Sequence, residues 1–324
     1  MNIMINTICN MRCSYCFAAN SMENGMHEEI SIDNFRFAIR FLKSSNSSVL
    51  RLLGGEPTLH SNFRNLIELA VAEGMSQIVV FTNGLFDPDL VAFLDAQTTK
   101  TRITLIINLN SPEYVGSDSY SVISENLALL HRTSVRVHLG INLYSSNMSI
   151  GYFMDALINN EYNSARWTIA IPSITDSSGF DVDAYYTQMI PLALSFLEQC
   201  YKNGIRTFND CHHIPMCYLD DSQLRRLLTY EPDYFVRKKC SPSLDVYPDL
   251  RVIRCFGASE MGHVNLRDYD SAAAITDYFR TSIDDRYFAC SKFVENGTCF
   301  MLHGECRGGC IGLARYPRNQ ALDR

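Results

Sequence analysis

The chain has 324 residues, a formal net charge of −7 and 47% hydrophobic residues. This length suits one barrel-sized domain with a small second domain, and the negative charge argues against a nucleic-acid-binding face, which would be basic. No apolar run approaches the roughly 20 residues that cross a bilayer. The start, MNIMINTIC, lacks the features of an export signal. We therefore expect a cytoplasmic protein that binds neither nucleic acid nor a membrane.

Apolar segments alternate with amphipathic segments through the first two thirds of the chain. The apolar segments are predicted strands with both faces buried, which is typical of a parallel sheet covered by helices. About six repeats of this alternation predict an α/β fold, a partial (β/α)6 TIM-like barrel. The predicted strands are 3–8, 49–54, 77–82, 103–109, 135–144 and 167–172, and the predicted helices between them are 31–45, 61–74, 88–96, 117–133 and 147–159.

A long helical pattern over 183–204 is followed by irregular, cysteine-rich sequence. We expect a barrel domain over 1–208 and a small irregular domain, held together by metal, over 209–324. Of the twelve cysteines, three occur by residue 16 and nine in the last 125 positions. Because disulfides are rare in a reducing cytoplasm, this grouping predicts metal sites. Cys200, within the long helix, is instead predicted to be a buried core thiol.

Three cysteines, Cys9, Cys13 and Cys16, directly follow the first predicted strand. The loops after the strands of a parallel barrel converge on one mouth, so these thiols should lie there. A structural zinc site has four protein ligands, and a cubane iron–sulfur cluster has four irons to ligate. Three thiols leave one position open, and an open position is what chemistry on a bound ligand requires.

A second motif, GGEP at Gly54–Pro57, ends the second predicted strand. Its two glycines allow the backbone to approach a ligand closely, because no Cβ is in the way. Taken alone, the motif is also compatible with an ordinary tight turn between a strand and a helix.

The Cys-x3-Cys-x2-Cys spacing, with Tyr15 before its last cysteine, together with GGEP at Gly54–Pro57, resembles the radical S-adenosylmethionine (radical SAM) superfamily. The resemblance covers roughly residues 1–205. It implies that the three cysteines hold a [4Fe–4S] cluster whose open iron binds S-adenosylmethionine. An electron passed into the sulfonium would then yield a 5′-deoxyadenosyl radical, which removes a hydrogen atom from the substrate.

The resemblance also implies roles for residues around the mouth. The loop of Gly54, Gly55, Glu56 and Pro57 would hold the methionine amino group, and Tyr15 would lie near the adenine. Polar strand-end residues contact the ribose or carboxylate in the family, which makes Asn108 and Asn142 candidates for cofactor binding, although such asparagines often only close turns. Other polar residues at strand ends are Thr82, Asn83, Asn110 and Tyr144, and general-base candidates that the sequence does not rank are Asp176, Asp181, Asp210 and Tyr144.

Near the C-terminus, Cys240 and Cys255 bracket an alternating stretch with a turn at Pro248–Asp249, which predicts a β-hairpin with a thiol at each base. The sequence CRGGC at 306–310 has two glycines that let the chain fold around a metal. This arrangement resembles the SPASM or twitch-type extension, which holds auxiliary iron–sulfur clusters. It departs from the family pattern, because the last four cysteines are separated by eight, six and three residues and no further cysteine follows.

The resemblance implies one or two auxiliary [4Fe–4S] clusters. The ligands implied for the first are Cys217, Cys240, Cys255 and Cys310, and those implied for the second are Cys290, Cys299 and Cys306. The second set lacks a fourth thiol, for which His303 is one candidate. A zinc knuckle on four of these thiols is the alternative. Cys211, in DCHHIPMC, is compatible equally with a metal ligand and with a loop or core position.

By this resemblance the protein is a radical SAM enzyme, and the favoured substrate is a peptide that is crosslinked, epimerised or oxidised at a side chain. Only eight residues precede Cys9, which leaves no room there for a leader-binding domain and favours the alternative, a small-molecule dehydrogenase. A non-catalytic iron–sulfur or zinc protein is a third class, against which the three-thiol site argues. The expected electron donor is a flavodoxin or a ferredoxin.

Overall fold

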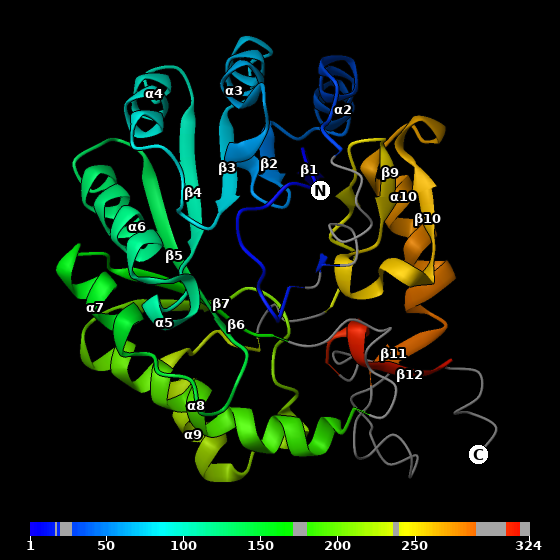
Figure 1. Cartoon of the computed structure of the whole chain (residues 1–324). Helices are drawn as coiled ribbons and strands as arrows, with labels where there is room; N and C mark the ends of the chain where they lie inside the picture. Colours follow the sequence, from blue (N-terminus) through cyan, green and yellow to red (C-terminus); the bar gives the residue numbers. More distant parts are fainter. Residues whose placement is uncertain (17, 20–27, 171–179, 236–239, 290–308, 318–324) are drawn as a thin grey trace.

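The computed structural model describes residues 1–16, 18–19, 28–170, 180–235, 240–289 and 309–317. Its centre is a curved ten-stranded sheet in the order β10-β9-β8-β1-β2-β3-β4-β5-β6-β7, with helices along its outer side (Figure 1). This arrangement confirms the expected α/β fold with a partial barrel.

The barrel part of the sheet is formed by parallel strands, each paired with the next along the chain from β1 to β7. Their bounds are β1 Asn2–Met4, β2 Val49–Leu53, β3 Gln77–Thr82, β4 Arg102–Asn108, β5 Arg136–Leu143, β6 Ser164–Ile169 and β7 Arg206–Asn209. The first six correspond to the predicted strands. The seventh, RTFN, was not predicted, because four residues of mixed polarity give no clear strand pattern.

The helices bury one apolar face each against the sheet. In α2, for example, Phe35, Ile39 and Leu42 are buried, and Ser31 caps the helix by accepting a hydrogen bond from the Asn34 backbone N–H. The helix bounds are α2 Ile32–Ser44, α3 Phe63–Ala72, α4 Asp89–Gln97, α5 Pro112–Val115, α6 Ser117–Leu130, α7 Gly151–Asn159, α8 Val182–Lys202, α9 Asp221–Tyr230 and α10 Ala272–Phe279.

The C-terminal region extends the same sheet beyond β1. The predicted hairpin is confirmed, because β8 (Asp245–Val246) pairs antiparallel with β9 (Arg251–Ile253). Strand β8 also pairs in parallel with β1, where Asn2 Nδ2 donates to Asp245 Oδ1 over 2.7 Å. Strand β10 (His263–Asn265) completes this edge, and β11 (Tyr287–Ala289) pairs with β12 (Ala314–Pro317) in a separate small sheet.

The expected domain boundary between residues 208 and 209 falls within β7, and the division into two domains stays a prediction. Just beyond α9, the buried carboxylate of Glu231 fixes the end of β7: it accepts hydrogen bonds from the Trp167 indole N–H over 2.8 Å and from the Asn209 backbone N–H over 2.9 Å. In the described part of the chain, none of the helices combines the length and the apolar character needed to span a bilayer.

Candidate active site

The three N-terminal thiols lie on the loop that follows β1, which leads towards the middle of the molecule (Figure 1). All three are partly buried. The Met11 backbone N–H donates to Cys9 Sγ over 3.4 Å, and Asn110 Nδ2 donates to Cys13 Sγ over 3.7 Å. Burial raises the pKa of each thiol, that of Cys16 to about 11. The metal-free thiols therefore keep their protons at neutral pH, and a bound metal has to displace them.

The GGEP loop packs directly against this thiol loop. The Gly55 N–H donates to the Asn6 carbonyl over 3.0 Å and the Glu56 N–H to the Ile8 carbonyl over 2.6 Å. A Cβ on Gly55 would lie 2.2 Å from the Ile8 carbonyl oxygen, and one on Gly54 would lie 2.4 Å from Asn6 Oδ1. Both glycines are thus required where the two loops meet, whatever ligand they also contact.

The Glu56 side chain is buried at the ends of β2 and β3. Its Oε1 accepts hydrogen bonds from the Thr58 N–H over 3.1 Å and from the Thr58 and Thr82 hydroxyls over 2.8 Å each, and its Oε2 accepts from the Asn83 N–H over 2.7 Å. Burial raises the pKa of this carboxyl and the hydrogen bonds partly oppose the rise. Glu56 therefore fixes the loop, which continues through Pro57 into the short helix η1 (Pro57–Leu59). Cofactor contact by Glu56 or Pro57 stays a prediction.

Three tyrosines hold the second half of the thiol loop. Tyr15 stacks on Tyr144 with ring centroids 4.9 Å apart, and Tyr114 lies 6.3 Å from Tyr15 and 5.8 Å from Tyr144. The Tyr15 hydroxyl donates to Asn110 Oδ1 over 2.5 Å and also interacts with Asn142. The structure thus brings Tyr15 and Asn142 together near Cys13, whereas their contact with the cofactor stays a prediction.

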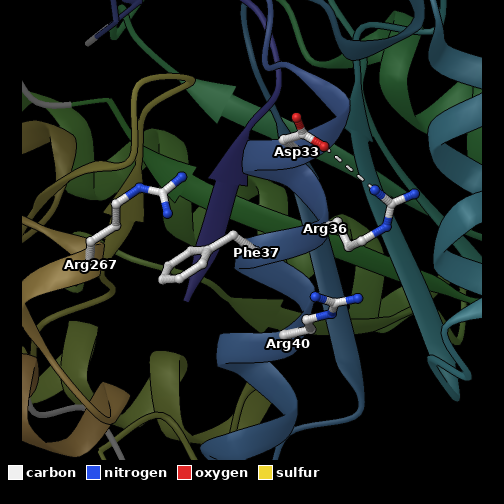
Figure 2. A pocket seen from close by; sticks show the side chains of 5 residues that line it. All are labelled: Asp33, Arg36, Phe37, Arg40 and Arg267. Carbon is white, nitrogen blue, oxygen red and sulfur yellow. Dashed lines mark ion pairs between the residues drawn. The ribbon is translucent and has the colours of Figure 1, made fainter.

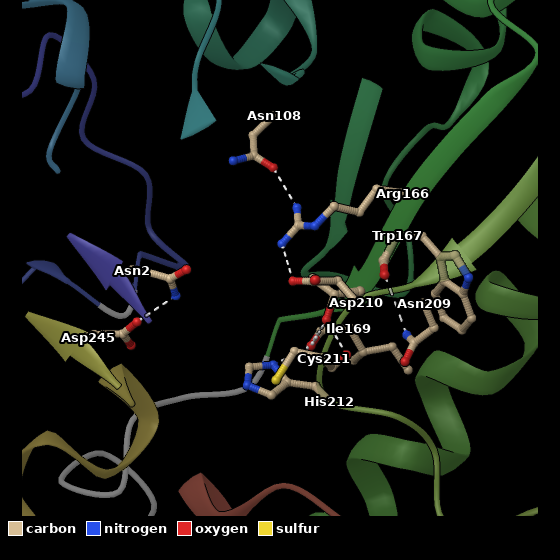
Figure 3. Close-up of polar contacts among 11 residues, drawn as sticks. Asn2, Asn108, Arg166, Trp167, Ile169, Asn209, Asp210, Cys211, His212 and Asp245 are labelled. Atoms are coloured by element: carbon tan, nitrogen blue, oxygen red, sulfur yellow. Dashed lines mark hydrogen bonds and ion pairs between the residues drawn. The ribbon is translucent and has the colours of Figure 1, made fainter. Parts of the chain in front are cut away.

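A buried cation, Arg166 of β6, lies inside the barrel. Arg166 Nη1 donates to Asn108 Oδ1 over 2.8 Å, and Nη2 pairs with Asp210 Oδ2 over 2.5 Å (Figure 3). Arg166 is 9% exposed, and its Nε has no hydrogen-bond partner among the described residues. Gly140 makes room for the pair, because a Cβ there would lie 2.9 Å from Asn108 Oδ1. Asn108 is therefore bound to Arg166, and one buried guanidinium N–H has no partner among the described residues.

The sequence analysis did not identify Arg166, because it placed the start of the sixth strand at Trp167, the residue after Arg166.

The structure places the general-base candidates in different surroundings. Asp181 caps α8 by accepting from the Ala184 N–H over 2.9 Å, and Asp210 pairs with Arg166. Tyr144 is stacked on Tyr15, and Asp176 lies outside the described residues.

A second group of thiols surrounds two cations next to the barrel. Arg254 donates from Nη1 to Cys255 Sγ and from Nη2 to Cys240 Sγ, both over 3.4 Å. Burial raises the pKa of Cys240; Arg254 lowers it, and Cys310 and Cys211 raise it further. Cys211, which follows β7, thus belongs to the same group as Cys240, Cys255 and Cys310.

The second cation is His212, next to Cys211 (Figure 3). Its Nδ1 lies 2.9 Å from the Ile169 carbonyl oxygen, which leaves Nε2 for the thiols. Burial lowers the pKa of His212, but the Cys310 and Cys211 thiols outweigh it, and the pKa lies well above its usual value. Conversely, burial raises the pKa of Cys310, but His212 outweighs that effect and the pKa is lowered. Each group therefore shifts the pKa of the other towards its charged form.

The remaining predicted thiols are placed differently. Cys217 lies in the short helix η3 (Met216–Tyr218), six residues beyond Cys211. Cys200 is fully buried in α8, as predicted. Within the described residues, no three His, Cys, Asp or Glu side chains form a set that could bind a single metal ion. The predicted ligands outside the described residues are Cys290, Cys299 and Cys306, together with His303.

A basic pocket lies between α2 and the segment that follows β10 (Figure 2). Arg267, which follows β10, lies over the Phe37 ring with its guanidinium carbon 4.4 Å from the ring centroid, and Arg36 pairs with Asp33 over 3.6 Å. Arg40 completes the lining. These contacts connect the C-terminal region to α2.

Comparison with protein families gives the site its context. Residues 3–148, which include the thiol loop, GGEP and strands β1 to β5, match the radical SAM superfamily. The chain carries a radical SAM domain. This domain confirms the resemblance found in the sequence, and the relatives described below are named as enzymes.

Two named relatives match part of the chain. An S-adenosylmethionine-dependent nucleotide dehydratase of Selenomonas ruminantium is 26% identical over 196 residues, covering 56% of this chain and 68% of that protein. A GTP 3′,8-cyclase of Moorella thermoacetica is 35% identical over 88 residues, which cover 26% of this chain and 27% of the cyclase.

Solved structures resemble almost the whole chain. SuiB of Streptococcus suis, bound to the precursor peptide SuiA, matches with a TM-score of 0.65 at 14% identity. The match covers 96% of this chain and 71% of SuiB. The structure of anSMEcpe with S-adenosylmethionine and the Kp18Cys peptide matches with a TM-score of 0.66 at 15% identity. That match covers 100% of this chain and 94% of anSMEcpe. At these identities the likeness shows a shared fold.

The residues of this radical SAM domain fit an iron–sulfur cluster at the thiol loop. Three thiols, the preferred ligands of such clusters, lie on one loop. The loop approaches Gly54 and Gly55 so closely that a side chain would displace it.

Replacing Gly55 with Ala should disrupt this site, because the new Cβ must push away the Ile8 carbonyl and, 3.0 Å away, the Cys9 Cβ. We expect loss of the roughly four irons of one [4Fe–4S] cluster per chain, and a decrease of about 1–3 kcal/mol in the free energy of unfolding, as for overpacking. Iron analysis after anaerobic reconstitution and denaturant unfolding measure both. Gly151→Ala is the control, because its new Cβ meets only Ser149 Oγ at 3.6 Å. Full iron content in Gly55→Ala would contradict the assignment.

Proposed function

We propose that this radical SAM enzyme modifies a peptide, by crosslinking, epimerisation or side-chain oxidation. The observation that supports a peptide is the extent of the structural likeness. SuiB and anSMEcpe, both solved with peptides, resemble 96% and 100% of this chain, including its C-terminal region. The nucleotide dehydratase matches only 56% of it.

In this proposal, Cys9, Cys13 and Cys16 hold a [4Fe–4S] cluster that binds S-adenosylmethionine at its open iron. When bound, the cluster and S-adenosylmethionine supply a 5′-deoxyadenosyl radical, which removes a hydrogen atom from the substrate. The chain's own residues orient and shield this chemistry. Gly54 and Gly55 leave room beside the thiols, and the stacked tyrosines keep water away from the loop.

We further propose that Cys211, Cys240, Cys255 and Cys310 hold an auxiliary [4Fe–4S] cluster, as in a SPASM or twitch-type extension. Four thiols satisfy four irons, so this cluster has no open position and suits electron transfer. We propose Cys211 as the upstream thiol of this set, in place of Cys217, because Cys211 interacts with Cys240 and His212. A second auxiliary cluster on Cys290, Cys299 and Cys306 stays a prediction. The flavodoxin or ferredoxin donor, the cytoplasmic location and the absence of nucleic-acid and membrane partners also stay predictions.

A small anionic substrate is the second candidate. The Arg166 guanidinium is buried inside the barrel with its Nε unpartnered among the described residues, and an arginine in such a place is suited to a phosphate or carboxylate. The sequence relatives named for nucleotides favour the same alternative. A small-molecule dehydrogenase, the alternative from sequence, belongs to this class.

Replacing Cys9, Cys13 and Cys16 together with Ala should abolish cleavage of S-adenosylmethionine, because no thiol remains at the mouth to hold the cluster. We expect the variant to lose about four irons per chain and to form no 5′-deoxyadenosine with dithionite, as measured by chromatography. The matched control is Cys200→Ala, which changes a buried core thiol. Cleavage that persists in the triple variant would refute the assignment of a radical SAM site.

Peptides should stimulate 5′-deoxyadenosine formation above the basal rate, because a substrate beside the cofactor consumes the radical. The probes are a library of short serine- and cysteine-containing peptides and, separately, the four ribonucleoside triphosphates. Peptide-dependent stimulation, with a mass shift in a library member, supports peptide modification. Stimulation by a nucleotide alone that is lost in Arg166→Gln, but not in the exposed-site control Arg136→Gln, would transfer the assignment to the second candidate.

The choice between Cys211 and Cys217 is tested by single alanine variants in the background that lacks Cys9, Cys13 and Cys16. Cys211→Ala should lose the iron of one cluster, about four per chain, whereas Cys217→Ala should keep it. Iron and sulfide analysis with Mössbauer spectroscopy measures the difference. The opposite pattern would restore Cys217 as the ligand, and zinc in place of iron would contradict an auxiliary iron–sulfur cluster.

A further inference from the structure

Arg254 is an unusual residue for its place in the fold. It directly follows β9 and is only 1% exposed. Its carbonyl oxygen accepts hydrogen bonds from the backbone N–H groups of Ser243 and Leu244, both over 3.0 Å. The backbone of Arg254 is therefore fixed by the hairpin, and its side chain is directed into the protein beside the second thiol group.

Three nitrogens of the guanidinium have partners. Nη1 donates to Cys255 Sγ and Nη2 to Cys240 Sγ, both over 3.4 Å, and Nε pairs with Asp284 Oδ1. Asp284 is itself fully buried. One planar group thus connects two thiols that are fifteen residues apart in sequence to a carboxylate on the segment that follows α10.

This arrangement is costly unless the thiols are anionic. A buried guanidinium must recover its lost hydration through good hydrogen bonds, and one carboxylate occupies only Nε. Neutral thiols are weak hydrogen-bond acceptors, whereas thiolates bound to iron are anionic. Arginine suits this position better than lysine, because its rigid fork can donate to two sulfurs and a carboxylate at once.

We propose that Arg254 raises the reduction potential of the auxiliary cluster by donating N–H···S hydrogen bonds to two of its thiolates. The inference rests on the proposed auxiliary cluster. Reduction adds an electron, and therefore a negative charge, to the cluster, and a cation with N–H groups directed at the sulfurs stabilises that charge. Hydrogen bonds to the sulfurs and cluster charge are known determinants of iron–sulfur potentials. Arg254 thereby makes this cluster a better acceptor for an electron from the substrate.

The test measures the midpoint potential of this cluster in the background that lacks Cys9, Cys13 and Cys16. Loss of an electron paramagnetic resonance signal in Cys255→Ala identifies the cluster. In Arg254→Gln we expect the equilibrium constant for reduction of the cluster to fall at least tenfold, which lowers the midpoint potential by at least 59 mV for one electron. Arg254→Lys keeps the charge and should recover part of the shift. The control is Arg251→Gln, a partly exposed arginine on β9, the strand that Arg254 follows, which should leave the potential unchanged.

Arg254→Gln with full iron content and an unchanged midpoint potential would overturn the inference. A second measurement needs no variant: protein labelled with 15N-arginine should show 15N hyperfine coupling in the reduced auxiliary cluster by pulsed electron paramagnetic resonance. If Arg254→Gln fails to fold or to bind iron, absence of that coupling in the labelled parent protein overturns the inference. Absence of any iron in the background variant would instead refute the auxiliary cluster itself, so the two failures are distinguishable.

Discussion

The candidate active site depends on one steric constraint, the close approach of the loop after β1 to the loop after β2. Two backbone hydrogen bonds join Asn6 and Ile8 to Gly55 and Glu56, and no Cβ fits at the contact. The buried Glu56 carboxylate then fixes the second loop to the end of β3. Because Gly55 packs against Ile8 and Cys9, the two glycines help to position the thiol loop, whatever ligand it holds.

The two thiol groups differ in the charges around them. Around Cys9, Cys13 and Cys16 burial raises the thiol pKa values, and the loop supplies neutral donors from Met11 and Asn110. The second group instead has Arg254 and His212 against its sulfurs. Buried cations favour negative charge on their neighbours. This difference agrees with the two roles proposed for them, ligand turnover at the N-terminal group and electron transfer at the C-terminal group.

Local sequence patterns were sufficient for the barrel but not for its two edges. The strands β1 to β6 are apolar runs between amphipathic helices, so their pattern predicts them. Strand β7 has only four residues, and β8 has two, so neither carries a period of its own. The parallel pairing of β8 with β1 joins residues more than 240 positions apart, through Asn2 and Asp245. No local pattern encodes such a pairing.

By itself, the sequence determined the chemistry that we propose for the N-terminal site, because three thiols and two glycines lie within short contiguous motifs whose spacing is visible. Only the tertiary structure decided which distant residues complete the sites. It placed Arg166 between Asn108 and Asp210, and it brought Cys211 to the hairpin thiols. The physical reason is that side chains from different strands meet only when the sheet curves. Once buried there, a charged side chain must have a partner of opposite charge or a hydrogen-bond partner.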